Sequence, residues 1–252
     1  MGDAISSVRL LVSDIDGTLL DRGRPTVGLS SLRALLQAYR HQVKLVYATG
    51  RSLESTLELV RGGVLPEPDA IAGFVGTEIG LAPGFEPLEE WAEQIAAGWN
   101  RSRAVAVALS FPRVRSQPER FQSPLKASFY LDAPEVVPVL ERALAAQRAG
   151  ARVIYSCDRY LDLIPAAAGK RNAAEHLRAR FHIPQSGVLT AGDSGNDLDM
   201  LLDGRFHGVA VGNAEQELRG VVKAEHLHAS DLPHAAGVLE GAEAFQFWTF
   251  RS

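Results

Sequence analysis

The feature that most constrains the fold is a repeated alternation between short apolar runs and helical patterns. Buried strands are expected at 8–14 (VRLLVSD), 43–50 (VKLVYATG), 70–80 (with a turn), 187–193 (GVLTAGD) and 206–214. Helices are expected between them, at 31–42, 52–62 (with Ser52 as N-cap), 169–181 and 196–204. Strands that alternate with helices are typical of βαβ units, so the sequence predicts an α/β fold with a Rossmann-like, largely parallel sheet.

The middle of the chain has a different pattern. A helical stretch at 87–110 is followed by a segment with several prolines, a strand at 125–132, a helix at 135–150, and two strands joined by a tight turn. This order suits a small α+β unit whose sheet is antiparallel. We therefore expect residues 83–165 to form a smaller α+β cap, inserted into a core made of residues 1–82 and 166–252.

Composition narrows the class of protein. Hydrophobic residues make up 46% of the 252 residues, enough for a full core, and the formal net charge of −4 argues against nucleic acid as a partner. A single cysteine, Cys157, excludes an intrachain disulfide and a multi-cysteine metal site. No apolar run reaches the roughly 18 residues of a membrane helix. We expect a soluble cytoplasmic protein without a membrane partner, for which a monomer is a possible state.

Two carboxylates follow the first apolar run, within LLVSDIDGTLL at 10–20. Asp14 and Asp16 are two residues apart, so at the end of a strand their side chains face the same side. One interpretation is a turn with acidic decoration, because Asp-Gly is a common turn dipeptide. A calcium loop does not fit, since its bidentate Glu would fall at Pro25. The other interpretation is a pair of reactive carboxylates.

Two further segments suit the binding of an anion. Thr49 and Gly50 end the second run just before a helix, an arrangement that favours an anion but fits a helix cap equally well. Lys170 opens the helix at 169–181, where the helix dipole disfavours a cation. Because the chain has 4 Lys against 22 Arg, this lysine indicates a compact ammonium near an anion, the alternative being a solvated surface lysine.

A fourth segment, TAGDSGNDLDML at 190–201, is rich in acidic and amide side chains. Asp193 ends a strand, and Asn196, Asp197 and Asp199 follow it. Oxygen ligands at this density suit a hard cation such as Mg²⁺. An acidic helix N-terminus would explain Asp197 and Asp199, but it would not explain Asp193 at the end of a strand.

The four segments converge in the predicted fold. In an open parallel sheet the carboxyl ends of the strands lie at one edge, where binding sites form. Asp14, Thr49 and Asp193 are therefore expected to meet there, with Lys170 on a helix nearby. Each segment has a purely structural explanation of its own, but four such explanations at one edge of the sheet are improbable together. The sequence therefore predicts a functional site.

In this order the segments resemble the motifs of the haloacid dehalogenase superfamily of phosphotransferases. DIDGT at 14–18 resembles the first motif, YATGR at 47–51 the second, Lys170 the third, and GDSGND at 192–197 the fourth. A cap between the second and third motifs resembles the C2 type, which implies a small-molecule substrate enclosed between cap and core. Five further stretches resemble sucrose-phosphatase and related sugar-phosphate phosphatases: 74–79, 125–132, 161–170, 210–218 and 228–245.

The resemblance implies a role for each core residue. Asp14 would be the nucleophile that forms an aspartyl-phosphate. Asp16 would be the general acid and base, its protonated form favoured by charge repulsion and partial burial. Thr49 and Lys170 would hold phosphoryl oxygens. The cofactor would be Mg²⁺, bound by Asp14, the backbone carbonyl of Asp16, Asp193 and Asp197.

The implied substrate is a sugar phosphate monoester. Sucrose 6-phosphate, mannosylfructose phosphate, glucosylglycerol phosphate and mannosyl-phosphoglycerate are equally compatible with the sequence. The residues expected to bind the substrate are Gly50, Arg51, Glu78, Gln122, Lys126, Arg159 and Asn196. Lys126 is singled out because it is a lysine in the cap, and its alternative role is that of a solvated edge-strand lysine that discourages aggregation.

Two other functions stay open on the sequence. A phosphosugar mutase of the same superfamily would use the same pair of aspartates and return the phosphoryl group to the sugar. A catalytically silent sugar-phosphate-binding subunit is the second alternative. The complete set of Asp14, Asp16, Lys170 and Asp193 argues against the silent subunit.

Overall fold

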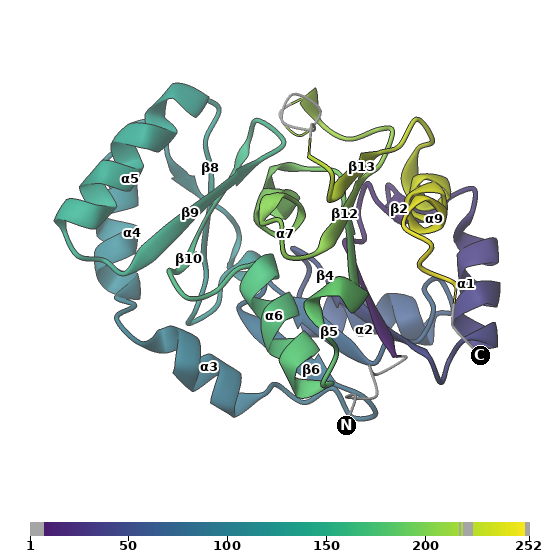
Figure 1. The fold of residues 1–252 in the computed structure, drawn as a ribbon. Helices are drawn as coiled ribbons and strands as arrows, with labels where there is room; N and C mark the ends of the chain where they lie inside the picture. Colours follow the sequence, from purple (N-terminus) through teal and green to yellow (C-terminus); the bar gives the residue numbers. More distant parts are fainter. Residues whose placement is uncertain (1–7, 217, 219–223, 250–252) are drawn as a thin grey trace.

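Seven strands form the large sheet of the computed structural model, which describes residues 8–216, 218 and 224–249 (Figure 1). Their order is β13-β12-β11-β1-β4-β5-β6, and all neighbours are parallel except β5 and β6. The strands are β1 (Arg9–Ser13), β4 (Val43–Ala48), β5 (Ala70–Gly73), β6 (Glu78–Leu81), β11 (Val188–Gly192), β12 (His207–Ala210) and β13 (Leu227–Ala229). The predicted α/β class with a mainly parallel sheet is confirmed.

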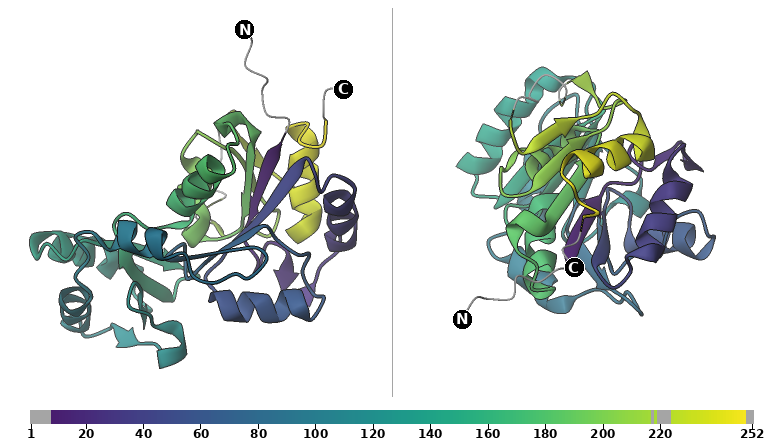
Figure 2. Two further views of the ribbon diagram at one scale, coloured as in Figure 1. Left: turned by 90° about the horizontal axis from the view of Figure 1, so that it is seen from below. Right: turned by 45° about the vertical axis from the view of Figure 1, so that its right-hand side comes forward.

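Helices cover both faces of the large sheet (Figure 2). Side chains of β1 alternate between two apolar clusters: Leu10 and Val12 belong to one, and Leu11 belongs to the other. The first cluster includes side chains of α3 (Glu89–Ala96), α6 (Lys170–Arg180) and α7 (Leu198–Leu202). The second includes side chains of α1 (Leu29–Ala38), α2 (Leu53–Arg61) and α9 (His234–Ala244).

The small sheet is antiparallel, in the order β7-β8-β10-β9, and lies to one side of the large sheet (Figure 1). Its strands are β7 (Arg115–Ser116), β8 (Ala127–Tyr130), β9 (Ala151–Ser156) and β10 (Tyr160–Pro165). Together with α4 (Arg101–Leu109) and α5 (Val137–Ala146) it encloses an apolar cluster of its own, which includes Phe129. Helix α3 instead buries Trp91 and Ile95 in a cluster of the large sheet.

Short elements complete the fold. The strands β2 (Leu20–Asp21) and β3 (Arg24–Pro25) form a two-stranded ribbon. In the described part of the chain there are also four single turns of 3₁₀ helix: η1 (Glu119–Phe121), η2 (Pro134–Val136), η3 (Gln185–Gly187) and η4 (Gly195–Asp197). Ser52 caps α2 as predicted, since its hydroxyl accepts the N–H of Ser55.

Two expected elements are each divided in the structure. The single helical stretch at 87–110 is wrong: α3 ends before Gly98, which has a φ of 78°, and α4 begins after Asn100, whose side chain accepts the N–H of Arg103. The expected strand at 70–80 is the antiparallel pair β5 and β6. The turn between them contains Phe74, Val75 and Gly76, all with positive φ.

Gly76 provides a test of this turn. Its φ is 79°, and a β-carbon there would lie 2.5 Å from the carbonyl oxygen of Gly169, which is the residue before α6. Gly63 has a similar φ of 70° but has no atom within 4 Å of the corresponding position. The two glycines therefore separate backbone strain from steric overlap.

We expect Gly76→Ala to lower the free energy of unfolding by about 3 kcal/mol, because the left-handed backbone and the overlap both oppose the β-carbon. Gly63→Ala is the matched control and should cost only about 1 kcal/mol. Urea unfolding followed by circular dichroism measures both values. Equal losses in the two variants would show that the contact with Gly169 is not tight.

Candidate active site

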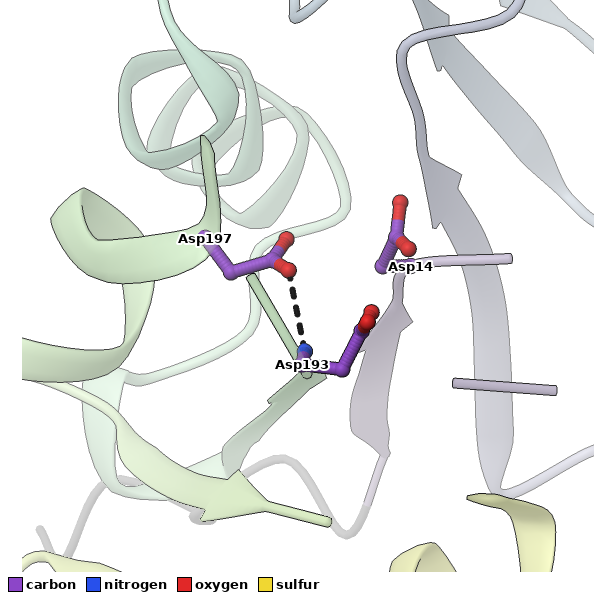
Figure 3. A group of neighbouring side chains, drawn as sticks. All are labelled: Asp14, Asp193 and Asp197. Atoms are coloured by element: carbon purple, nitrogen blue, oxygen red, sulfur yellow. Dashed lines mark hydrogen bonds between the residues drawn. The ribbon is translucent and has the colours of Figure 1, made fainter. Parts of the chain in front are cut away.

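Three carboxylates from different segments meet at the carboxyl edge of the large sheet. Asp14 follows β1, Asp193 follows β11, and Asp197 ends η4. One oxygen of each carboxylate lies within 4.8 Å of the others, and the three side chains point toward one another (Figure 3). The meeting point is the one expected when the carboxyl ends of parallel strands share an edge.

Lys170 is the positive group of this cluster. It is the first residue of α6 and is completely buried. Its ammonium donates to Oδ1 of Asp14 at 2.6 Å and to Oδ1 of Asp197 at 2.7 Å. The interpretation of Lys170 as a solvated surface lysine is therefore wrong. With one ammonium among three carboxylates, the cluster carries two negative charges in excess when all four groups are ionised.

This excess changes the protonation of the carboxylates. Burial raises the pKa of Asp14 to about 7, and the charge of Asp197 adds to the effect while Lys170 opposes it. Burial also raises the pKa of Asp193 to about 9, with repulsion from Asp14 and Asp197. Burial alone would lower the pKa of Lys170, but attraction to Asp14 and Asp197 raises it above its ordinary value.

The donor set fits a hard divalent cation. It consists of carboxylate oxygens, which Mg²⁺ prefers, and its excess of two negative charges would be cancelled by such an ion. The three carboxylates are also held in place by neighbours. Asp193 accepts from the hydroxyl of Thr18 at 2.9 Å, and the second oxygen of Asp197 accepts the N–H groups of Asp193 and Ser194.

Gly17 is required beside Asp193. Its φ is 86°, and a β-carbon at this position would lie 2.1 Å from Oδ2 of Asp193. The carbonyl of Gly17 accepts from the side chains of Asn213 and His234, at 2.8 and 2.7 Å. The loop after β1 is thus fixed both by the fourth segment and by the C-terminal part of the large sheet.

Asp16 lies apart from the three carboxylates. Its side chain is 47% exposed, and both of its oxygens accept from Arg51, from Nε at 2.6 Å and from Nη2 at 2.7 Å. The hydrogen bonds that Arg51 donates to Asp16 raise the pKa of its guanidinium. Both oxygens of Asp16 are thus engaged by one guanidinium, and the role of Asp16 as general acid and base stays a prediction.

Thr49 and Gly50 take the expected positions after β4. Thr49 is buried, and its hydroxyl accepts the N–H of Arg51 at 3.2 Å. Both residues lie in the wall of a cavity of about 1290 Å³ that also has walls from the small sheet. The proposed site residues found in this wall are Asp14, Asp16, Thr49, Gly50, Arg51, Glu78, Lys126, Asp193 and Asn196.

The candidates for sugar contacts differ in their surroundings. Lys126 is 4% exposed, lies 3.2 Å from Asp162, and has its ammonium over the ring of Phe74. A solvated edge-strand lysine is therefore the wrong interpretation. Glu78 accepts the N–H of Leu53 at 2.7 Å, and burial raises the pKa of its carboxyl. The buried Oδ1 of Asn196 has no hydrogen-bond partner among the described residues.

Two other candidates are not brought to the cavity wall. The amide of Gln122 is engaged by main-chain groups, since its Nε2 donates to the carbonyls of Gln117 and Ser128 and its Oε1 accepts the N–H of Ser128. Arg159 is exposed, and its guanidinium stacks over the ring of Tyr130. Neither residue is part of the wall.

Sequence reasoning missed most of the wall that the small sheet contributes. Tyr130 on β8 and Tyr160 and Asp162 on β10 all line the cavity. Tyr130 is paired with Tyr160, and Ser128 with Asp162, so these residues share one face of the antiparallel pair. The signal was available: residues 126, 128 and 130 have the period of two that places side chains on one face of a strand.

Comparison with known proteins agrees with this geometry. The family described as sucrose-6F-phosphate phosphohydrolase matches residues 7–246. The chain is 34% identical to a probable sucrose-phosphatase 3a of Arabidopsis thaliana, over 94% of this chain but only 59% of that protein. It is 32% identical to the mannosylfructose-phosphate phosphatase of Agrobacterium fabrum, over 93% of this chain and 95% of the relative. The chain thus spans little more than half of the plant relative and nearly all of the bacterial one.

Solved structures have the same fold. The sucrose-phosphatase of Synechocystis, solved with sucrose and phosphate, superimposes with a TM-score of 0.89 at 32% identity, covering 96% of this chain and 99% of that one. A haloacid dehalogenase-like hydrolase of Bacillus subtilis has a TM-score of 0.67 at 18% identity, over 98% of this chain and 95% of that one, and supports the fold alone. Within the described residues, no helix is long and apolar enough to cross a membrane. The chain belongs to the sucrose-6F-phosphate phosphohydrolase family, within the haloacid dehalogenase superfamily.

Proposed function

We propose that this protein is a Mg²⁺-dependent phosphatase that hydrolyses a sugar phosphate monoester through an aspartyl-phosphate intermediate. The observation that carries the proposal is the position of Asp14. Its carboxylate is largely buried, accepts from the ammonium of Lys170 at 2.6 Å, and forms part of the wall of the large cavity. The family and the sucrose-phosphatase relatives support the same activity. Sucrose 6-phosphate or a related disaccharide or glycoside phosphate is the proposed substrate class.

The proposed metal ligands are Asp14, Asp193, Asp197 and the backbone carbonyl of Asp16. Mg²⁺ bound there would keep Asp14 ionised and offset the negative charge of the phosphoryl group. The excess of two negative charges in the cluster supports this assignment.

Asp14 is the proposed nucleophile. Its carboxylate oxygen forms a bond to phosphorus, and the bond between phosphorus and the sugar oxygen breaks. The ammonium of Lys170 has three donors, of which two are used by Asp14 and Asp197, so one remains for a phosphoryl oxygen. The hydroxyl of Thr49 and the backbone near Gly50 are the proposed partners of the other phosphoryl oxygens.

Asp16 is the proposed proton carrier. It gives a proton to the departing sugar oxygen, and then takes one from the water that attacks the aspartyl-phosphate. For this role the carboxyl group of Asp16 must give up its hydrogen bonds with Arg51 and contact the substrate instead. The pair with Arg51 is half-exposed, so water can replace these hydrogen bonds and the exchange has a low cost.

The segment 83–165 is the proposed cap, and its side chains are proposed to bind the sugar part of the substrate and to determine specificity. The cavity of about 1290 Å³ is larger than the roughly 300–1,000 Å³ that encloses a drug-sized ligand, so a disaccharide fits. Lys126, Glu78 and Asn196 are proposed to hydrogen-bond sugar hydroxyls, and the rings of Phe74 and Tyr130 supply apolar walls.

The substrate class can be tested by direct measurement of phosphate release. We expect release with Mg²⁺, and none with EDTA, from at least one of sucrose 6-phosphate, mannosylfructose phosphate, glucosylglycerol phosphate and mannosyl-phosphoglycerate. Product analysis separates the alternatives that the sequence leaves open. An isomerised sugar phosphate would indicate a mutase, and no turnover of any sugar phosphate would indicate a silent subunit.

The nucleophile is tested by Asp14→Asn, which keeps the shape of the side chain but removes the attacking oxygen. We expect kcat to fall by at least about 10⁴-fold, because loss of a nucleophile removes the covalent route. Asp21→Asn, the same change at an exposed position of β2, is the matched control and should retain full activity. Substantial turnover by a folded Asp14→Asn protein, checked by circular dichroism, would refute the assignment.

The metal site makes a prediction about pH. The raised pKa values of Asp14 and Asp193 mean that the folded, metal-free protein binds protons more tightly than the unfolded chain does. Its free energy of unfolding should therefore fall as pH rises from the ordinary carboxyl value of 3.8 toward about 9. Mg²⁺ competes with these protons, so it should stabilise the protein more at high pH.

We expect the increase in melting temperature on adding Mg²⁺ to be larger at about pH 8.5 than at about pH 5.5. A concentration about 100 times the Kd corresponds to about 2.7 kcal/mol of stabilisation. Asp193→Asn, which removes one ligand and one negative charge, should nearly abolish the increase at both pH values. An increase that is independent of pH in the wild-type protein would contradict the metal assignment.

A further inference from the structure

An ion pair joins the small sheet to the part of the large-sheet unit that holds Lys170. Arg152 on β9 contacts Oδ2 of Asp199 on α7 through Nη1, at 3.0 Å. The Asp199 side chain is 10% exposed and that of Arg152 is 31% exposed. The pair is therefore largely withdrawn from water, where the mutual attraction of two charges is stronger than at an open surface.

The same aspartate oxygen also contacts the start of α6. Oδ2 of Asp199 accepts the N–H of Arg171 at 3.3 Å, and Arg171 directly follows Lys170. The Nη1 atom of Arg152 donates to the carbonyl of Ala168 at 3.4 Å. Arg152 and Asp199 thus contact the main chain on both sides of Lys170 without touching its ammonium.

Gly169 makes room for this arrangement. A β-carbon at Gly169 would lie 2.6 Å from Nη1 of Arg152 and 2.8 Å from Oδ2 of Asp199, and its φ is 115°. The chain that returns from the small sheet to α6 therefore passes directly against the ion pair.

The position of Asp199 also links the pair to the carboxylate cluster. Asp199 lies two residues after Asp197, which accepts from the ammonium of Lys170 at 2.7 Å. The apolar contacts point the same way, since Ile154 of β9 and Ile164 of β10 are buried in a cluster of the large sheet. One end of the small sheet is therefore packed against the two segments that position Lys170.

We propose that Arg152 and Asp199 are positioning residues that couple the placement of the small sheet to the placement of Lys170. Movement of β9 relative to α7 pulls on the ion pair, and through the N–H of Arg171 it changes where α6 begins. The ammonium of Lys170 then meets Asp14 and a phosphoryl oxygen only when the small sheet is seated. The catalytic consequence rests on the proposed phosphatase function, whereas the mechanical link does not.

The mechanical link is tested by amide hydrogen exchange in the full-length protein. Arg152→Gln leaves Asp199 and its bond to Arg171 intact, so a loss of protection at Arg171 can come only through the missing arginine. We expect the amides of residues 168–173 to exchange about 3–30-fold faster, a range typical of coupling between residues. Arg115→Gln is the matched control, because Arg115 forms an exposed pair with Asp132 on the small sheet, and it should leave these amides unchanged.

The catalytic consequence is tested with two substrates and a double-mutant cycle. Arg152→Gln and Asp199→Asn should each lower kcat about 3–30-fold, for sucrose 6-phosphate and for p-nitrophenyl phosphate alike, because Lys170 serves both. The double variant should be no slower than the slower single variant, because the two residues act as one unit. A loss confined to sucrose 6-phosphate, or losses that multiply in the double variant, would overturn the coupling to Lys170.

Unchanged amide exchange at 168–173 in Arg152→Gln would overturn the proposal whatever the kinetics. If Arg152→Gln does not fold, Arg152→Lys is measured in the same way. It keeps the charge and loses the planar donor group, and it should give a smaller increase in exchange. If the wild-type protein hydrolyses another of the four sugar phosphates instead of sucrose 6-phosphate, that sugar phosphate replaces it in the kinetic test. If the wild-type protein hydrolyses none of the four and no p-nitrophenyl phosphate, the proposed function fails, and the exchange measurement still decides whether the link exists.

Discussion

The buried ammonium of Lys170 is the interaction on which the rest of the site depends. A charge without contact to water is costly unless it is paired, and Lys170 is paired twice, with Asp14 and with Asp197. These two contacts bring together the end of β1, the start of α6 and the turn η4. Removing Lys170 would leave the buried carboxylates of Asp14 and Asp197 without a positive partner, so the folded site and its chemistry depend on the same charges.

Incomplete neutralisation gives this cluster its chemical character. Lys170 balances one of the three carboxylates, and burial weakens the hydration of the others, as the raised pKa values of Asp14 and Asp193 indicate. Such a donor set suits a divalent cation, and the proposed cation would supply the positive charge that the anionic phosphoryl group needs at this edge. Two carboxylates, Asp14 and Asp197, contact the ammonium of Lys170. Of these two, Asp14 is the one that lines the cavity.

The core of the site was predictable because strand ends in a parallel sheet obey a simple rule. The apolar runs that became β1, β4 and β11 have the periodicity of buried strands, and the polar residues that follow them must share an edge. No such rule governs the loops. The sequence cannot tell that the amide of Gln122 bonds to main-chain groups, because that depends on how the segment around η1 folds back on β8. The ion pair between Asp16 and Arg51 is equally unpredictable, because it depends on the directions that the two side chains take in loops far apart in the sequence.

The residues of the cavity wall are intermediate in how well they can be predicted from the sequence. Tyr130 and Asp162 face the cavity because of the register between β8 and β10 and because side chains alternate between the two faces along each strand. That information was present in the sequence, but it becomes useful only once the pairing partners are known.

The contact between Gly17 and Asp193 has a consequence for how this protein can evolve. A β-carbon on residue 17 would occupy the space of the Asp193 carboxylate, so no side chain can be accepted at one position while the other keeps its present place. The two residues are 176 positions apart in the sequence, yet each limits which side chains can be accepted at the other.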